Sequence, residues 1–302
     1  MCSILKINER RIQRWRKEAA FEKFNRKPRE SGNHIPFNAL TPEENKLVDY
    51  LIASKENADD SCRVLSAKAM DEYEVYISHV TFHNRMKEKG INGPRGVQAK
   101  RKSVHTKPDT GDITGPNQLW SWDITFLKTT TRYKSYYLYA LLDWYSRKVI
   151  AWHISEFLSS DEAQTLWDKG ILSEGLKTGE LPGSLCDRGS QMRSTSTKSF
   201  FMTLGVHQYF SRPRTPNDNP QIEALFSTVK NHPEYPGRFS SLTAAEEYFN
   251  SFFDWYNNEH YHTGIGMVTP SDRHSGRDAE IFKVRENIKH NTFKARRALH
   301  CK

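Results

Sequence analysis

Three acidic residues lie at positions from which their side chains could together hold divalent cations. Asp123 lies in the strand-like run WSWDITF, Asp187 ends the run LPGSLCD, and Glu223 lies one turn into a predicted helix. A lone charge between Trp122 and Ile124 is costly unless it faces a site. Metal-dependent phosphodiester chemistry needs carboxylates from different elements, so that two cations about 3.5–4 Å apart can bind the attacking and leaving oxygens. Each acid alone could instead be a solvated or helix-capping residue.

Basic side chains near these acids are candidates for contacts with phosphate. The helix that carries Glu223 is predicted over residues 220–231, with Asn219 as its cap. Lys230 follows Glu223 by seven residues, so it lies two turns along the same helix face and is placed to meet a phosphate near the acids. An ordinary solvated lysine is the alternative. Two arginines in the Pro-rich stretch before the helix are further predicted DNA contacts, namely Arg212 and Arg214.

The segments around the acids predict an α/β domain over residues 116–276. Three strand-like runs come first, WSWDITFLK, YYLYALLDWY and RKVIAWHIS, and only a tight turn fits between the last two. Helices and strands then alternate: a helix over 160–177, the strand LPGSLCD, a helix over 196–204, the strand HQYF, and helices over 220–231 and 242–258. This order is typical of a ribonuclease H-like α/β core, a mixed five-stranded sheet flanked by helices.

An all-α region over residues 36–92 precedes this core. Thr41 and Glu44 form the pattern of a capping box around Pro42, and Ser78 can cap a later helix that stops at Gly90. Three short helices in this order predict a helix-turn-helix DNA-binding domain, although a three-helix protein-binding bundle is the alternative. The polar residues of the last helix are the predicted DNA contacts: His79, Thr81, His83, Asn84, Arg85 and Lys87.

The remaining segments are basic. Residues 1–30 resemble the back half of a helix-turn-helix, so either the chain starts late or another polypeptide, an upstream-frame partner or fusion, completes the unit; a basic amphipathic helix packed elsewhere is the alternative. Residues 93–115 form a basic linker, and the tail over 277–302 is basic with apolar residues at helical spacing. The arginines of the first segment are predicted DNA contacts: Arg10, Arg11 and Arg14.

The overall composition favours nucleic acid as the partner. The 302 residues carry a net charge of +9, and the surplus attracts polyanions because binding releases the counterions condensed on phosphate. No apolar run approaches the roughly 20 residues that span a bilayer; the longest, around 136–145, contains Asp143 and is predicted to be a buried strand. The four cysteines are far apart in the sequence. A prokaryotic cytoplasmic, nucleoid-associated protein without a membrane is expected.

Five blocks together resemble a known family. GPNQLWSWDITFLKTT, LLDWYSRKVIAWHIS, LCDRGSQ, TPNDNPQIEALFSTVKNH and DWYNNEHYHTGIGMVTPSDRHSG are similar to the successive blocks of the retroviral-integrase-type catalytic core, in the version found in OrfB-type insertion-sequence transposases. The 35 residues between Asp187 and Glu223 are a spacing typical of this DDE class.

The resemblance implies a DNA transposase that nicks the ends of a mobile element and joins them to target DNA. It implies that Asp123, Asp187 and Glu223 are catalytic and bind two Mg²⁺ or Mn²⁺ ions, that the substrates are double-stranded DNA, and that the protein acts as a homo-oligomer. Arg188 departs from the pattern, because the family usually has Asn after the second Asp. A phosphate contact and a weakening of metal binding are both open for Arg188.

Two other functions remain as alternatives. A ribonuclease H-like nuclease would share the fold, but the upstream helical segments and the block WYNNEHYHTGIGMVTP argue against it. A catalytically silent DNA-binding protein derived from a transposase would recognise element ends without cutting them. The presence of all three acids argues against a silent protein.

Overall fold

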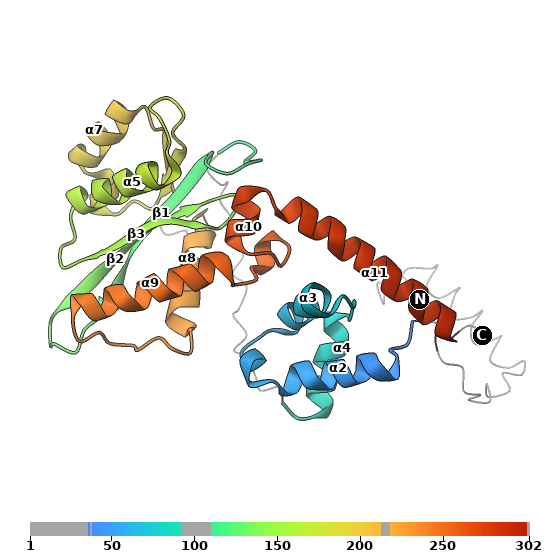
Figure 1. Ribbon diagram of the computed structural model, residues 1–302. Helices are drawn as coiled ribbons and strands as arrows, with labels where there is room; N and C mark the ends of the chain where they lie inside the picture. Colours follow the sequence, from blue (N-terminus) through green and yellow to red (C-terminus); the bar gives the residue numbers. More distant parts are fainter. Residues whose placement is uncertain (1–35, 37, 92–109, 213–217, 301–302) are drawn as a thin grey trace, which may run out of the picture. The chain divides into compact units, whose positions relative to one another are not determined.

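The computed structural model of the chain describes residues 36, 38–91, 110–212 and 218–300 (Figure 1). Its contacts divide the chain into two compact units, residues 1–47 together with 290–302, and residues 48–289. The predicted DNA contacts Arg10, Arg11, Arg14 and Arg214, the predicted partial helix-turn-helix at residues 1–30 and most of the predicted linker lie outside the described residues.

A mixed five-stranded sheet forms the centre of the second unit. Its strands lie in the order β3-β2-β1-β4-β5. β1 pairs antiparallel with β2, as β2 does with β3, whereas β4 lies parallel to both β1 and β5. The mixed five-stranded sheet predicted from the sequence is therefore confirmed. The strands are β1 Leu119–Lys128, β2 Ser135–Asp143, β3 Val149–Ser155, β4 Gly183–Cys186 and β5 Gln208–Phe210.

Helices cover both faces of this sheet (Figure 1). On one face, Trp120 and Trp122 of β1 pack with Trp167 and Phe201 of the helices, and on the other Leu138 of β2 packs with side chains of α8 and α9. Since side chains alternate along a strand, β1 contributes to both cores. The first face carries α5 Ser160–Glu174 and α7 Thr195–Leu204, and the second carries α8 Pro220–Asn231 and α9 Leu242–Asn258.

Two predicted helix boundaries differ from those observed. The helix predicted over 160–177 ends at Glu174, because Gly175 follows in the left-handed conformation with φ of 62°. The helix predicted over 196–204 starts one residue earlier and is preceded by the short α6 Ser190–Arg193, because the Ser194 hydroxyl accepts a hydrogen bond from the amide of Thr197 and starts α7 there.

The helical segments outside the core also follow the predicted starts. The capping box before α2 is present, with the Thr41 hydroxyl accepting from the Glu44 amide at 3.2 Å and the Glu44 carboxylate accepting from the Thr41 amide at 2.8 Å. Ser78 caps α4. Within the described ranges, no helix is both long and apolar enough to cross a bilayer. The helices other than α5 to α9 are α2 Pro42–Ala53, η1 Lys55–Asn57, α3 Cys62–Tyr73, α4 His79–Glu88, η3 Thr263–Ile265, α10 Pro270–Ser275 and α11 Asp278–His300.

A buried polar network holds the turn between β2 and β3. Asp143 is fully buried, and its carboxylate accepts hydrogen bonds from the Ser146 amide at 2.7 Å, the Ser146 hydroxyl at 2.6 Å and the Asn117 amide at 2.8 Å. His274 of α10 contacts the Ser146 hydroxyl at 3.0 Å and Glu174 of α5 at 2.8 Å. The network thus joins the turn, α5 and α10 through the fully buried Asp143 and Ser146 and the mostly buried Glu174 and His274.

The charges of this network are mutually supporting. Burial alone would lower the pKa of His274, but hydrogen bonds to Asp143 and Glu174 outweigh it and raise that pKa. Burial alone would raise the pKa of Glu174, but hydrogen bonds from His274, Asn117 and Lys148 lower that pKa to about 2. The hydrogen bond between His274 and Glu174 therefore favours the charged form of each side chain, which makes each dependent on the other.

Candidate active site

The register of the parallel strands brings Asp187 next to Asp123. Ser121 of β1 is paired with Leu185 of β4. Each aspartate lies two residues further along its own strand direction, so continuing this register sets the two aspartates side by side. Asp187 follows directly after the last residue of β4, and its Oδ1 accepts a hydrogen bond from the Gly189 amide at 2.8 Å. The strand end and the mid-strand residue therefore meet at one place on the sheet.

Helix α8 is fixed along β1 on both sides of Glu223. At its start, the Ser121 hydroxyl donates a hydrogen bond to Oδ1 of Asn219. At its end, the ammonium of Lys230 donates to the Thr125 hydroxyl at 2.8 Å. Since Ser121 and Thr125 flank Asp123 by two residues and share its face of the strand, these contacts hold the exposed Glu223 over the same part of β1.

The electrostatics of the three carboxylates show that they interact. Burial raises the pKa of Asp123 to about 7, a hydrogen bond from the Ile124 amide opposes the rise, and the charges of Asp187 and Glu223 add to it. The positive charge of Lys230 lowers the same pKa. Burial also raises the pKa of Glu223. Negative charge is therefore concentrated here, and Lys230 offsets only part of it.

This donor set suits a hard divalent cation. Three carboxylates supply oxygen ligands, which Mg²⁺ prefers, and a cation would offset the repulsion from Asp187 and Glu223 that adds to the effect of burial on the pKa of Asp123. In the part of the chain that the structure describes, no three His, Cys, Asp or Glu side chains are already arranged to hold a metal ion. Asp123, Asp187 and Glu223 are therefore the residues that would hold such a cation.

The raised pKa of Asp123 predicts a pH-dependent stability of the metal-free protein. In the unfolded chain the pKa of Asp123 is about 4. The folded state binds this proton more tightly, so the stability that Asp123 contributes is fully present below pH 4 and is lost as pH rises through about 7. Asp123→Asn removes the titrating group. In EDTA, its gain in unfolding free energy over wild type should be larger at pH 8 than at pH 5, by on the order of 1–3 kcal/mol.

Urea denaturation of both proteins at the two pH values measures this gain. Asp168→Asn, at an exposed position of α5, is the matched control and should show no such difference. An Asp123→Asn gain that is equal at pH 5 and pH 8 would contradict the assignment of a raised pKa to Asp123.

The predicted phosphate contacts near the acids differ in how they are placed. Lys230 is exposed and donates to the Thr125 hydroxyl, and its contact with a phosphate stays a prediction. Arg188 donates from Nε to the carbonyl of Ser211 at 2.9 Å. Arg212 donates from Nε and Nη2 to Asp218, at 2.7 and 2.6 Å. Both arginines thus have partners inside the protein, and their contacts with DNA stay predictions.

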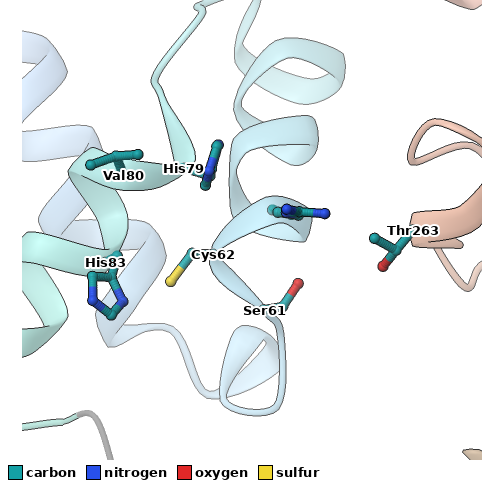
Figure 2. A pocket seen from close by; sticks show the side chains of 7 residues that line it. Ser61, Cys62, His79, Val80, His83 and Thr263 are labelled. Carbon is teal, nitrogen blue, oxygen red and sulfur yellow. The ribbon is translucent and has the colours of Figure 1, made fainter. Parts of the chain in front are cut away.

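The predicted DNA contacts of the helical region lie on α4. His79, His83, Asn84 and Lys87 are exposed, Thr81 is partly exposed, and Arg85 donates to Asp49 at 3.3 Å. Figure 2 shows that His79 and His83 also line a pocket together with Val80, with Cys62 of α3 and with Ser61, the N-cap of α3. None of the three acids lines this pocket. The helices are as predicted, and DNA recognition by them stays a prediction.

Two residues of the site were not predicted. Ser121 and Thr125 lie two residues before and after Asp123, and the strand period of two was the signal that could have found them, since it puts all three side chains on one face.

Asn219 has the predicted N-cap position, but its side chain makes no capping hydrogen bond and accepts from Ser121 instead. The predicted cap contact is therefore wrong, because a partner on β1 takes the side-chain oxygen.

Comparison with known proteins gives two matches to one kind of domain. A family model described as an integrase core domain matches residues 113–216, and a second with the same description matches residues 204–270. The transposase for insertion sequence element IS904 of Lactococcus lactis subsp. lactis (strain IL1403) is 26% identical over 160 residues, which are 53% of this chain and 62% of that protein. The insertion element IS600 uncharacterized 31 kDa protein of Shigella sonnei is 25% identical over 188 residues, covering 59% of this chain and 66% of that protein.

The matched region thus spans less than two thirds of the length of these relatives. Among solved structures, the simian T-cell lymphotropic virus intasome in complex with PP2A regulatory subunit B56 gamma is similar with a TM-score of 0.43 and 18% identity, covering 66% of this chain and 67% of that one. The HTLV-2 integrase catalytic core domain in complex with magnesium, in its dimeric form, has a TM-score of 0.40 and 16% identity, covering 53% of this chain and 97% of that one.

Proposed function

Because residues 113–270 belong to the integrase core domain family, we propose that the chain is a DNA transposase that cuts the ends of a mobile element and joins them to target DNA. The observation that carries this proposal is the attachment of α8 to β1 on both sides of Glu223, by Ser121 with Asn219 and by Lys230 with Thr125. This attachment supports a site in which three acids from three elements act together.

The chemistry consists of two displacements at phosphorus. In the first, a water oxygen bonds to the phosphorus at the element end as the bond from that phosphorus to the 3′ oxygen breaks, which leaves a 3′-hydroxyl and a 5′-phosphate. In the second, the 3′-hydroxyl oxygen loses its proton and bonds to a target phosphorus, and the 3′ oxygen of the target strand leaves. Divalent cations, when bound, neutralise charge on the attacking and leaving oxygens.

The side chains of the site have separate parts in this chemistry. Asp123, Asp187 and Glu223 would hold Mg²⁺ or Mn²⁺, two ions per site, through carboxylate oxygens. Asp123 must lose its proton to bind a cation, and its pKa of about 7 means that it does so near neutral pH. Lys230 carries a positive charge two turns from Glu223, where it can attract a phosphate of the bound strand.

Binding of DNA completes the proposal. The net charge of +9 favours a polyanion, and the exposed polar residues of α4, His79, His83, Asn84 and Lys87, are the proposed contacts of a helix-turn-helix with element ends. Because two ends must be processed together, we propose that the protein acts on DNA as a homo-oligomer. The nucleoid in the cytoplasm of a prokaryote is the proposed place of action.

Incubation with labelled element-end DNA tests the function. Double-stranded end DNA and a supercoiled target plasmid are mixed with the protein and Mg²⁺ or Mn²⁺. The products are separated on denaturing gels. A nicked end and an end joined to plasmid are expected with either metal and absent in EDTA. Tight, specific binding without any metal-dependent product would contradict the proposal and favour a silent DNA-binding protein; cleavage of RNA–DNA hybrids alone would favour a ribonuclease H-like nuclease.

A further inference from the structure

The side chain of Arg188, next to Asp187, is turned toward the end of β5. Its Nε donates to the carbonyl of Ser211 at 2.9 Å, and its guanidinium lies 6.0 Å from the centre of the Phe210 ring. The amide of Ser211 in turn donates to the carbonyl of Cys186 at 2.9 Å. The residues on either side of Asp187 therefore both bind Ser211, one through the backbone and the other through its side chain.

The next contact in the chain is an ion pair between Arg212 and Asp218. Asp218 is only 3% exposed, and its carboxylate accepts from the Arg212 amide at 2.9 Å, from Nε at 2.7 Å and from Nη2 at 2.6 Å. A guanidinium that binds one carboxylate through two nitrogens fixes both distance and orientation. The backbone at Asp218 is thus held at a set place relative to Arg212.

Asp218 leads directly into the helix that carries Glu223. Its neighbour Asn219 accepts from the Ser121 hydroxyl on β1, and the carbonyl of Asn219 accepts from the Glu223 amide at 3.4 Å. A continuous path therefore leads from Asp187 to Glu223. It runs from Arg188 to Ser211 and from Arg212 to Asp218 by hydrogen bonds, and Asn219 connects it to β1. Among these residues, Arg188 and Asp218 supply the side chains that join one segment to the next.

We propose that Arg188 and Asp218 are positioning residues, which hold Glu223 at the correct place relative to Asp123 and Asp187. The proposal rests on the proposed function for its effect on catalysis, but the mechanical link itself does not. It assigns Arg188, which stands where Asn is usual, a role within the protein rather than on DNA. Residues that orient metal ligands without touching the metal typically lower metal affinity or activity about 10- to 100-fold when they are replaced.

The first measurement uses no activity. Hydrogen–deuterium exchange is followed by mass spectrometry on the full chain as wild type, Arg188→Ala, Asp218→Asn and Arg193→Ala. Arg193 is an exposed arginine of α6 and makes a matched control for the loss of one charge. Amides in the first turn of α8, residues 221–224, should exchange at least about threefold faster in the first two variants than in wild type or Arg193→Ala, since each of the two removes a contact that leads to the start of that helix.

The second measurement separates positioning from DNA binding. Arg188→Ala should lower kcat for strand transfer about tenfold, leave KM for end DNA within about twofold, and raise the Mn²⁺ concentration needed for half-maximal rate, with Tm unchanged. Arg188→Lys should recover part of kcat, because its ammonium can still donate to the Ser211 carbonyl. Arg193→Ala should match wild type in every value.

Two results would overturn the proposal. One is unchanged exchange in residues 221–224 of both variants. The other is a raised KM and a weaker salt dependence of DNA binding in Arg188→Ala with kcat unchanged, since that is the behaviour of a phosphate contact. If exchange is faster in the two variants but wild type gives no strand-transfer product, the mechanical link stands and the proposed function fails.

Discussion

Replacing Asp187 with Asn is expected to lower nicking and strand transfer about a thousandfold while leaving the binding of end DNA intact. The amide is neutral and a poor ligand for Mg²⁺, so the site would no longer hold the metal ions that the reaction needs. Asp187 is exposed and lies after the last residue of β4, so the change leaves the core of the sheet untouched. Glu223→Gln, one turn into α8 and also exposed, should have the same effect for the same reason.

Single-turnover rates on labelled end DNA, with a mobility-shift assay for binding, measure this prediction. Because one negative charge is removed, DNA binding should be equal to that of wild type or slightly tighter. Glu180→Gln, an exposed acid in the segment before β4, is the matched control and should keep the wild-type rate. Either active-site variant retaining more than about a tenth of the wild-type rate in Mg²⁺ would show that its carboxylate is not required.

Asp143→Ala is expected to lower the free energy of unfolding by about 3–5 kcal/mol, the range seen when one partner of a buried charged network is removed. The carboxylate is fully buried and accepts from the Ser146 amide, the Ser146 hydroxyl and the Asn117 amide. Without it, these donors stay in an interior that water does not reach. His274, whose Nδ1 lies 3.8 Å from Asp143, also loses a carboxylate that helps to raise its pKa.

Urea denaturation followed by tryptophan fluorescence measures the loss. Asp143→Asn should be intermediate, because its amide oxygen can accept one set of hydrogen bonds while its NH₂ group faces a donor. Asp168→Ala, at an exposed position of α5, should change stability by no more than about 0.5 kcal/mol. A loss below about 1 kcal/mol in Asp143→Ala would mean that the network does not stabilise the turn between β2 and β3.

Local patterns predicted most of the fold. Residues within one helical turn predict three helix starts, and each is present. They are the capping box at Thr41 and Glu44, the cap at Ser78 and the start of α8 at Pro220. The alternation of the strand-like runs predicted the five-stranded sheet. The errors lie at boundaries, such as the break before α7, where Ser194 and Thr197 form a cap that the apolar pattern alone does not reveal.

Contacts between distant segments could not be predicted in this way. Arg212, whose contact with DNA stays a prediction, also donates to Asp218 within the protein. Asp143 was predicted only as a break in an apolar run, whereas it accepts hydrogen bonds from Asn117, 26 residues away. Whether a charged side chain faces DNA, a metal or another part of the protein depends on which groups lie nearby in space, and sequence spacing alone does not fix these neighbours.

The three acids illustrate both parts of this division. Their types, their order and the strand, strand end and helix that carry them follow from the sequence, because strand and helix periods are local properties. Their approach to one another was decided by the tertiary structure, through the pairing of β1 with β4 and the attachment of α8 to Ser121 and Thr125. Strand register and helix docking depend on the summed packing and hydrogen bonding of segments about a hundred residues apart, and only the folded chain brings those segments together.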